Sequence, residues 1–206
     1  MSYIYTTKNL SYACNNKEII RSISCRIESG TITSVKGANG AGKTTFLKLL
    51  YGLYDPTSGT ILRNFDTKNI KLAYIFQNSV FLNRSVKNNL EHVLYCKDIK
   101  KNQWNDIIED VLERFKLNYM LNLDIQSLSG GELQLLALIR SILITPDILF
   151  YDEPSNNLDK ENARLVLDII SSIHDKGSTI IIVSHDNEFL SYFKSTQINI
   201  ERGLLV

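Results

Sequence analysis

The sequence predicts an α/β fold with a parallel β-sheet at its centre, and three features indicate it. Short apolar runs with β-branched or aromatic residues recur at residues 72–76, 148–151 and 179–183. Near-continuous apolar strands are typical of a sheet that is covered on both faces. Helical patterns separate these runs, and a glycine-rich loop follows an early strand. Strand, loop and helix therefore follow in the order that a phosphate site needs.

The elements before and after this loop can be predicted in order. Two β-rich segments, about residues 4–12 and 19–27, open the chain, and a strand at 32–36 leads directly into the loop. Residues 55–59 (Asp-Pro-Thr-Ser-Gly) are typical of an ordinary turn. Apolar residues recur at helical spacing from Trp104 to Phe115, which indicates an amphipathic helix.

This helix belongs to a stretch, about residues 79–126, that we expect to be mostly helical. Gln77-Asn78 and Ser127-Leu128-Ser129 are its expected boundaries.

Composition excludes several classes of function. The 206 residues are 44% hydrophobic and 22% charged, with a formal net charge of +1, which indicates one soluble globular unit without a surface for nucleic acid. Apolar runs fall far short of the roughly 20 residues that span a bilayer. The cysteines Cys14, Cys25 and Cys96 fit neither a zinc site nor a disulfide framework. Because residues 1–8 do not resemble a secretory signal, we expect a cytosolic location.

The glycine loop is the strongest candidate for a binding site. It reads Gly37-Ala38-Asn39-Gly40-Ala41-Gly42-Lys43-Thr44. Its glycines let backbone N–H groups approach phosphate oxygens, and a helix that begins near Lys43 adds its dipole. We expect Lys43 to reach the β and γ phosphates, Thr44 to ligate Mg²⁺ and Thr45 to contact phosphate as well. A glycine-rich turn that only caps a helix is disfavoured by the preceding strand.

Two adjacent acids, Asp152 and Glu153, end the predicted buried strand at 148–151. Unpaired carboxylates at such a place are costly. Binding of Mg²⁺ would explain Asp152 and leave Glu153 to act as the general base on an attacking water. The alternative is an acidic turn at the edge of the sheet.

A second anion site is indicated at Ser129-Gly130-Gly131-Glu132, which opens a helix that is apolar nearly all round. We expect the Ser129 side chain and the amides of Gly130 and Gly131 to bind an anion. An ordinary serine N-cap followed by two flexible glycines fits the local sequence equally well. The position of this segment, between the glycine loop and the acidic pair, favours the anion site.

Taken together, these motifs resemble the nucleotide-binding subunit of ABC transporters over essentially the whole chain. The resemblance identifies residues 37–45 as Walker A, Gln77 as the Q-loop glutamine, residues 128–132 as the signature, Asp152 and Glu153 as Walker B with the catalytic glutamate, Asn157-Leu158-Asp159 as the D-loop, and His185 as the switch histidine. It implies that Gln77 is a Mg²⁺ and water ligand and that His185 contacts the γ phosphate. Without it, Gln77 could be a surface amide and His185 a structural histidine.

The resemblance also implies the fold. It is a P-loop NTPase of the ABC-cassette type with a parallel-sheet core, an N-terminal antiparallel β subdomain and a helical subdomain. We expect a single ABC ATPase domain over residues 1–206, with the catalytic core and β subdomain in 1–76 and 127–206 and the helical subdomain in about 77–126.

The resemblance further implies ATP hydrolysis with partners. Two cassettes, identical copies or a mixed pair, would bind ATP head to tail, each nucleotide held by Lys43 and Glu153 of one chain and by Ser129 and Gly131 of the other. Transmembrane permease subunits would carry the solute, and the resemblance allows a substrate-binding protein as an optional partner. The chain would lie on the cytoplasmic face of the membrane.

Residues 74–90 resemble small-solute importers of the oxyanion or amino-acid type. The alternatives are an exporter, a soluble ATPase that acts on ribosomes or DNA, and a regulatory cassette that does not hydrolyse ATP.

Two departures from the family stand out. Cys14 occupies the position where relatives often place an aromatic ring against adenine, and Tyr12, two residues earlier, is expected to face the core. Selectivity for the base is therefore not explained by the motifs. Leu135 replaces an arginine that is common after the signature, although Arg140 is retained.

Overall fold

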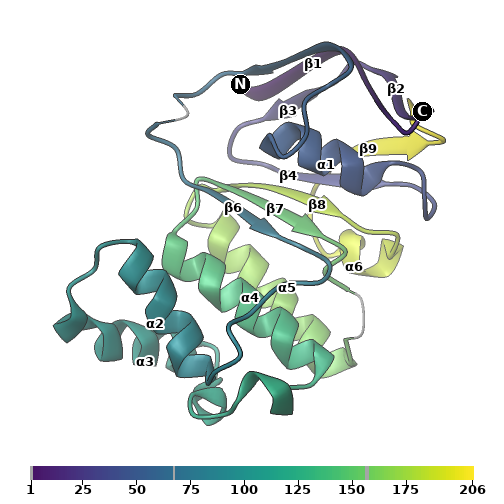
Figure 1. Ribbon diagram of the computed structural model, residues 1–206. Helices are drawn as coiled ribbons and strands as arrows, with labels where there is room; N and C mark the ends of the chain where they lie inside the picture. The colour runs from purple at the N-terminus through teal and green to yellow at the C-terminus, as the bar shows by residue number, and fades with distance from the viewer. Residues whose placement is uncertain (1, 67, 156–157) are drawn as a thin grey trace.

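Two β-sheets form the framework of the protein, as a computed structural model that describes residues 2–66, 68–155 and 158–206 shows (Figure 1). The larger sheet has the strand order β10-β9-β4-β8-β7-β6. Its strands are β4 (Ile32–Lys36), β6 (Leu72–Ile75), β7 (Ile148–Asp152), β8 (Thr179–Val183), β9 (Thr196–Glu201) and β10 (Leu204–Leu205). All neighbouring pairs are parallel except β9 and β10. The parallel sheet predicted from the apolar runs is thus confirmed.

The second sheet is antiparallel and pairs β1 with three other strands. It contains β1 (Tyr3–Cys14), β2 (Lys17–Ile23), β3 (Arg26–Glu28) and β5 (Ser58–Arg63). The β-rich segment expected at about 19–27 is extended as predicted, but the chain divides there into two strands, β2 and β3. The Thr7 hydroxyl donates to the carbonyl of Ile23 at 3.1 Å and accepts from the N–H of Cys25 at 2.9 Å, so a side chain replaces backbone pairing at the division.

The turn expected at residues 55–59 is only partly correct. Strand β5 already begins at Ser58, which pairs with Ser11 of β1. Turn-forming residue types report local backbone preference, whereas this pairing depends on a strand some 50 positions earlier.

The helices cover both faces of the parallel sheet. They are α1 (Lys43–Tyr51), α2 (Val86–Cys96), α3 (Trp104–Arg114), α4 (Gly130–Ile144), α5 (Lys160–His174) and α6 (Asn187–Ser191). Figure 1 shows α1 between the two sheets, and α4 and α5 on the opposite face of the parallel sheet. Each side has its own apolar core, one around Phe46 and Phe150 and one around Leu136 and Ile169.

The predicted amphipathic helix is α3, which packs its apolar side with Ile108, Val111 and Leu112 buried. Short 3₁₀ turns at Lys101–Gln103, Asn118–Met120 and Ile125–Ser127 connect the helices of this region. Both α2 and α3 contact α4, so the helical region is continuous with the core beneath the sheet. No helix in the described residues is long and apolar enough to cross a membrane.

Candidate nucleotide site

The glycine loop joins the end of β4 to the beginning of α1, as the sequence predicts. At Gly37 a Cβ atom would lie 2.1 Å from the carbonyl oxygen of Ile200, so no side chain fits between the loop and β9. Gly42 is the N-cap of α1 with φ of +104° and offers the helix no side-chain cap. The first N–H groups of α1 therefore remain available to a bound anion.

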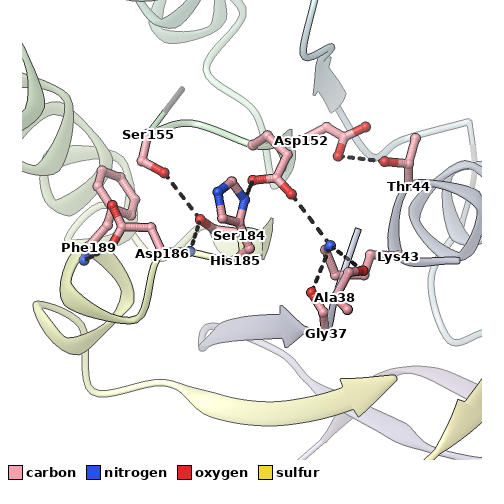
Figure 2. A network of polar contacts seen from close by, with 11 residues as sticks. Gly37, Ala38, Lys43, Thr44, Asp152, Ser155, Ser184, His185, Asp186 and Phe189 are labelled. Atoms are coloured by element: carbon pink, nitrogen blue, oxygen red, sulfur yellow. Dashed lines mark hydrogen bonds and ion pairs between the residues drawn. The ribbon is translucent and has the colours of Figure 1, made fainter. Parts of the chain in front are cut away.

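Lys43 lies inside this loop and is 6% exposed. Its Nζ donates to the carbonyl of Gly37 at 2.9 Å and to that of Ala38 at 3.2 Å (Figure 2). The same nitrogen is 3.5 Å from Glu153 Oε1, and both side chains are buried. A buried ammonium must be paired or hydrogen-bonded, and here it is both.

Glu153 connects the loop to His185. Its Oε2 lies 2.8 Å from His185 Nδ1, and Figure 2 shows His185 directed toward the acidic end of β7. Glu153 has a φ of +54°, which is unusual for a residue with a side chain, and its N–H donates to the carbonyl of Val183 at 2.8 Å. Strain of this kind persists where the surrounding structure holds it, often at functional sites. The carboxylate is thus fixed between a cation and an imidazole.

Asp152, the other acid, accepts a hydrogen bond from the Thr44 hydroxyl at 2.9 Å. Burial raises the pKa of this carboxyl above its ordinary value, and the neighbouring Glu153 charge adds to the effect. The Tyr74 hydroxyl is also buried and finds no hydrogen-bond partner among the described residues.

These residues fit a hard cation. Mg²⁺ takes oxygen ligands at about 2.1 Å in octahedral geometry, so neighbouring ligands lie about 3 Å apart. Thr44 Oγ1 and Asp152 Oδ1 show that spacing.

A cleft of about 930 Å³ brings the predicted site residues together. Those that line it are Asn39, Gly40, Gly42, Lys43, Thr44, Thr45, Gln77, Glu153 and His185. Gly37, Ala38, Ala41 and Asp152 do not line the cleft, but their atoms hold Lys43, Thr44 and the loop backbone. Gln77 reaches the cleft from the segment after β6. Four separate stretches of sequence therefore meet in one place.

The predicted second anion site lies outside this cleft, since Ser129, Gly130 and Gly131 are absent from its walls. They begin α4 on the other side of the sheet from α1 (Figure 1). Glu132 Oε2 accepts from the Ser129 N–H and from its hydroxyl, both at 2.8 Å, and these bonds lower the pKa of the Glu132 carboxyl. Ser129 is therefore an N-cap in a capping box, with Glu132 as a partner that the sequence analysis missed.

The predicted D-loop is described only in part, because Asn157 lies outside the described residues. Asp159 accepts from the Asn162 N–H at 2.8 Å and caps α5. At Gly131 a Cβ atom would lie 2.7 Å from Asn162 Nδ2, so the starts of α4 and α5 pack closely.

Both departures from the family can be placed. Cys14 is exposed, and Tyr12 is half-buried with its ring stacked on Tyr54 at 5.2 Å between centroids. Tyr12 packs against the core on one side, so the expectation that it faces the core is correct only in part. Leu135 is fully buried, where an unpaired arginine charge would be costly. Arg140 donates to the carbonyl of Val80 at 2.9 Å.

One buried contact escaped the sequence analysis. The hydroxyl of Tyr151, on β7 next to Asp152, donates to Gln134 Oε1 of α4 at 2.9 Å. Gln134 comes two residues after the signature, within the apolar stretch of α4 that runs from Leu133 to Ile139. A glutamine in such a helix was the sequence signal that could have predicted a buried hydrogen bond here.

Fold and site together define a nucleoside triphosphatase of the cassette type, and comparison with known proteins agrees. A model of the ABC transporter family matches residues 20–156, and the chain belongs to this family as an ATP-binding, ATP-hydrolysing subunit.

Two curated relatives and one solved structure illustrate the similarity. The zinc import ATP-binding protein ZnuC of Hydrogenovibrio crunogenus is 36% identical over 190 residues, which cover 90% of this chain and 74% of the relative. The lipoprotein-releasing system ATP-binding protein LolD of Buchnera aphidicola subsp. Acyrthosiphon pisum is 33% identical over 182 residues, covering 82% and 80%.

The solved structure is a dimeric, post-hydrolysis state of the ATP-binding cassette MJ0796 bound to ADP and Pi. It superposes with a TM-score of 0.84 at 21% identity and covers 98% of this chain and 96% of that one. At this identity the likeness concerns the fold.

Proposed function

We propose that the chain works as one of two paired cassettes that hydrolyse ATP between them and drive a membrane permease. One observation carries this proposal. The cleft holds Lys43, Glu153 and His185 in a connected network, whereas Ser129 and Gly131 begin a helix elsewhere. The N-terminus of this helix has the residues of a phosphate site, but it lies outside the cleft of its own chain. Its position is explained if it completes the nucleotide site of a facing cassette.

In this proposal the residues of the cleft have separate roles in binding phosphate, binding Mg²⁺ and catalysing hydrolysis. The loop amides and Lys43 bind the phosphates, since Lys43 is already directed into the loop by two carbonyls. Thr44, Asp152 and Gln77 would hold Mg²⁺, which neutralises negative charge on the phosphates. Glu153 accepts the proton of the attacking water as general base. His185 orients the Glu153 carboxylate, from which its Nδ1 lies 2.8 Å away, and would contact the terminal phosphate.

The facing cassette would supply Ser129 and the amides of Gly130 and Gly131. In the single chain, Glu132 already accepts from the Ser129 N–H and hydroxyl. Charge-assisted hydrogen bonds of this kind keep the start of α4 ordered before a phosphate arrives. The partner is a second copy of the chain or a similar cassette.

We propose a permease partner for the region around the segment between β6 and α2. Phe76, Val80 and Leu82 of this segment are exposed by 40%, 84% and 39%. Neighbouring exposed apolar side chains are typical of an interaction surface. The chain would then lie peripherally on the cytoplasmic face of the membrane.

For the cargo we propose a small solute that is imported, of the oxyanion or amino-acid type, with a substrate-binding protein as an optional further partner. The similarity of residues 74–90 to such importers supports this choice. The name of the lipoprotein-releasing relative keeps an export-type system as the second candidate.

The catalytic assignment is tested with Glu153→Gln. We expect ATP binding to persist and the hydrolysis rate to fall by about 10²- to 10³-fold, since one stabilising group is lost at the reacting centre. The variant should also accumulate as a dimer with ATP, measured by light scattering after gel filtration. Glu109→Gln, at an exposed position on α3, is the control. Normal hydrolysis by Glu153→Gln would overturn the assignment.

The partner assignment needs a separate experiment. The tagged chain should recover a hydrophobic membrane protein from detergent-solubilised membranes, and Val80→Asp should weaken that recovery. Recovery of ribosomes or DNA instead would favour a soluble ATPase.

A further inference from the structure

The nucleotide cleft has two chemically different ends. Glu153 and His185 lie together beside Lys43 at one end, where the proposed function places the terminal phosphate and water. The remaining wall comes from β2 and from the turn between β9 and β10, at Lys17, Glu18, Ile19, Arg21 and Arg202. Because the phosphate loop lies between these two ends, the nucleoside half of a bound nucleotide extends toward the second.

Apart from the imidazole of His185, which is held on Glu153 at the opposite end, no aromatic ring lines this cleft in the described part of the chain. A nucleobase needs a flat partner for stacking, and proteins supply either an aromatic ring or the guanidinium plane of arginine. At the second end of the cleft, only Arg21 and Arg202 offer such a plane among the described lining residues. Ile19, half-buried, adds apolar surface beside them.

The two arginines differ in their contacts. Arg21 Nε lies 3.7 Å from Glu18 Oε2, so part of its guanidinium is engaged. Arg202 is exposed and makes no hydrogen bond or ion pair with residues 2–66, 68–155 or 158–206. Its guanidinium is therefore available to a ligand.

The backbone around Arg202 is nevertheless fixed. Its φ is +48°, a left-handed conformation that residues with a side chain rarely adopt. The N–H of Gly203 donates to the carbonyl of Ala41 in the phosphate loop at 3.0 Å. The carbonyl of Gly203 accepts from the Arg21 N–H at 2.7 Å. The turn thus holds Arg202 between the phosphate loop and β2.

We propose that Arg202 binds the nucleobase by stacking its guanidinium on the ring, and so determines which nucleotides this chain accepts. This inference rests on the proposed nucleotide cleft. The strength of stacking depends on the size of the base ring and not on the hydrogen-bonding groups at its edge. Adenine and guanine nucleotides therefore bind about equally, and pyrimidine nucleotides bind more weakly.

The test measures binding of ADP, GDP, CDP and inorganic pyrophosphate by calorimetry, because none of these ligands is turned over. Arg202→Ala should weaken ADP and GDP by about 3- to 30-fold and leave pyrophosphate unchanged within twofold. Arg202→Lys keeps the charge without the plane and should lose most of the same affinity. Arg202→Trp should restore purine binding.

Several results would overturn the inference. They are an equal loss of pyrophosphate affinity in Arg202→Ala, full affinity in Arg202→Lys, or strong preference of the unmodified chain for ADP over GDP. Arg164→Ala, at an exposed position on α5, is the matched control. Lys43→Ala tests the cleft itself, since it should abolish binding of pyrophosphate as well as ADP. If Lys43→Ala binds normally, the proposed function fails whatever Arg202 does.

Discussion

At the scale of single residues, the site combines strain and buried charge. Asp152 is 2% exposed and Glu153 is 6% exposed, and the two carboxyl groups are adjacent in the chain. Burial and mutual repulsion both oppose ionisation of Asp152, while the Thr44 hydroxyl and nearby lysines favour it. The raised pKa shows that burial dominates. A group arranged in this way lowers the stability of the folded chain and serves ligand binding instead.

Asp152→Asn should therefore raise the free energy of unfolding at neutral pH while it abolishes ATP hydrolysis. The amide keeps an acceptor for Thr44 and removes the buried charge. A gain of about 1 kcal/mol in the free energy of unfolding raises the midpoint temperature of thermal unfolding by roughly 2–4 °C in a chain of this size. Thermal unfolding measures it, with Asp110→Asn at an exposed position as control.

The pH dependence gives this prediction a second readout. The pKa of Asp152 is higher in the folded chain than its ordinary value of 3.8. The stabilising contribution of the protonated form is thus complete below about pH 3.8 and is lost as the pH rises through the raised pKa. The advantage of Asp152→Asn should shrink as the pH falls from 8 toward 5. A constant difference between the variants would contradict this explanation.

At the scale of elements, α4 connects the signature to the catalytic strand. It begins at Ser129, packs against α5 at Gly131 and accepts a hydrogen bond from β7 through Gln134. Both Tyr151 and Gln134 are buried, so their hydrogen bond lies in a region of low dielectric constant. A displacement of the start of α4 would act on the strand that carries Asp152.

Tyr151→Phe should lower the free energy of unfolding by about 1–3 kcal/mol, because it leaves the Gln134 oxygen buried without a partner. The double variant Tyr151→Phe with Gln134→Leu should recover much of that loss, since neither polar group then remains. A double-mutant cycle measures this coupling. It compares the free energies of unfolding of the unmodified chain, the two single variants and the double variant by chemical denaturation. Additive losses in the double variant would show that the hydrogen bond contributes little.

At the scale of the whole molecule, the proposed function requires two halves of a nucleotide site that lie apart in one chain. Lys43 and Glu153 line the cleft on the side of the sheet that carries α1, whereas Ser129 begins a helix on the other face. Two copies related by a twofold axis bring each half to the other, which is the usual symmetry of a homodimer.

A mixing experiment tests this arrangement. Lys43→Ala and Ser129→Arg should each be inactive alone. Mixed, they form pairs in which one site combines the intact Lys43 of one chain with the intact Ser129 of the other, so ATPase activity should partly return. The return of activity itself shows that both variants fold. If each chain used its own Ser129, mixing would restore nothing.

Sequence reasoning succeeded where local chemistry specifies the structure. The glycines and Lys43 of the loop and the strands at 32–36 and 179–183 are encoded in short stretches, and their elements begin or end where expected. It failed where pairing between distant segments decides. The division of β2 from β3 depends on the Thr7 side chain, and β5 forms because β1 offers an edge.

By itself, the sequence determined the class of the protein and predicted which residues handle phosphate, because a phosphate loop and an acidic strand end require particular residue types at particular spacings. Only the tertiary structure decided which residues share a cleft. It placed Arg202 beside the phosphate loop through two backbone hydrogen bonds and placed Ser129 away from it. These positions depend on how strands distant in the sequence pair, and local residue patterns carry no record of that pairing.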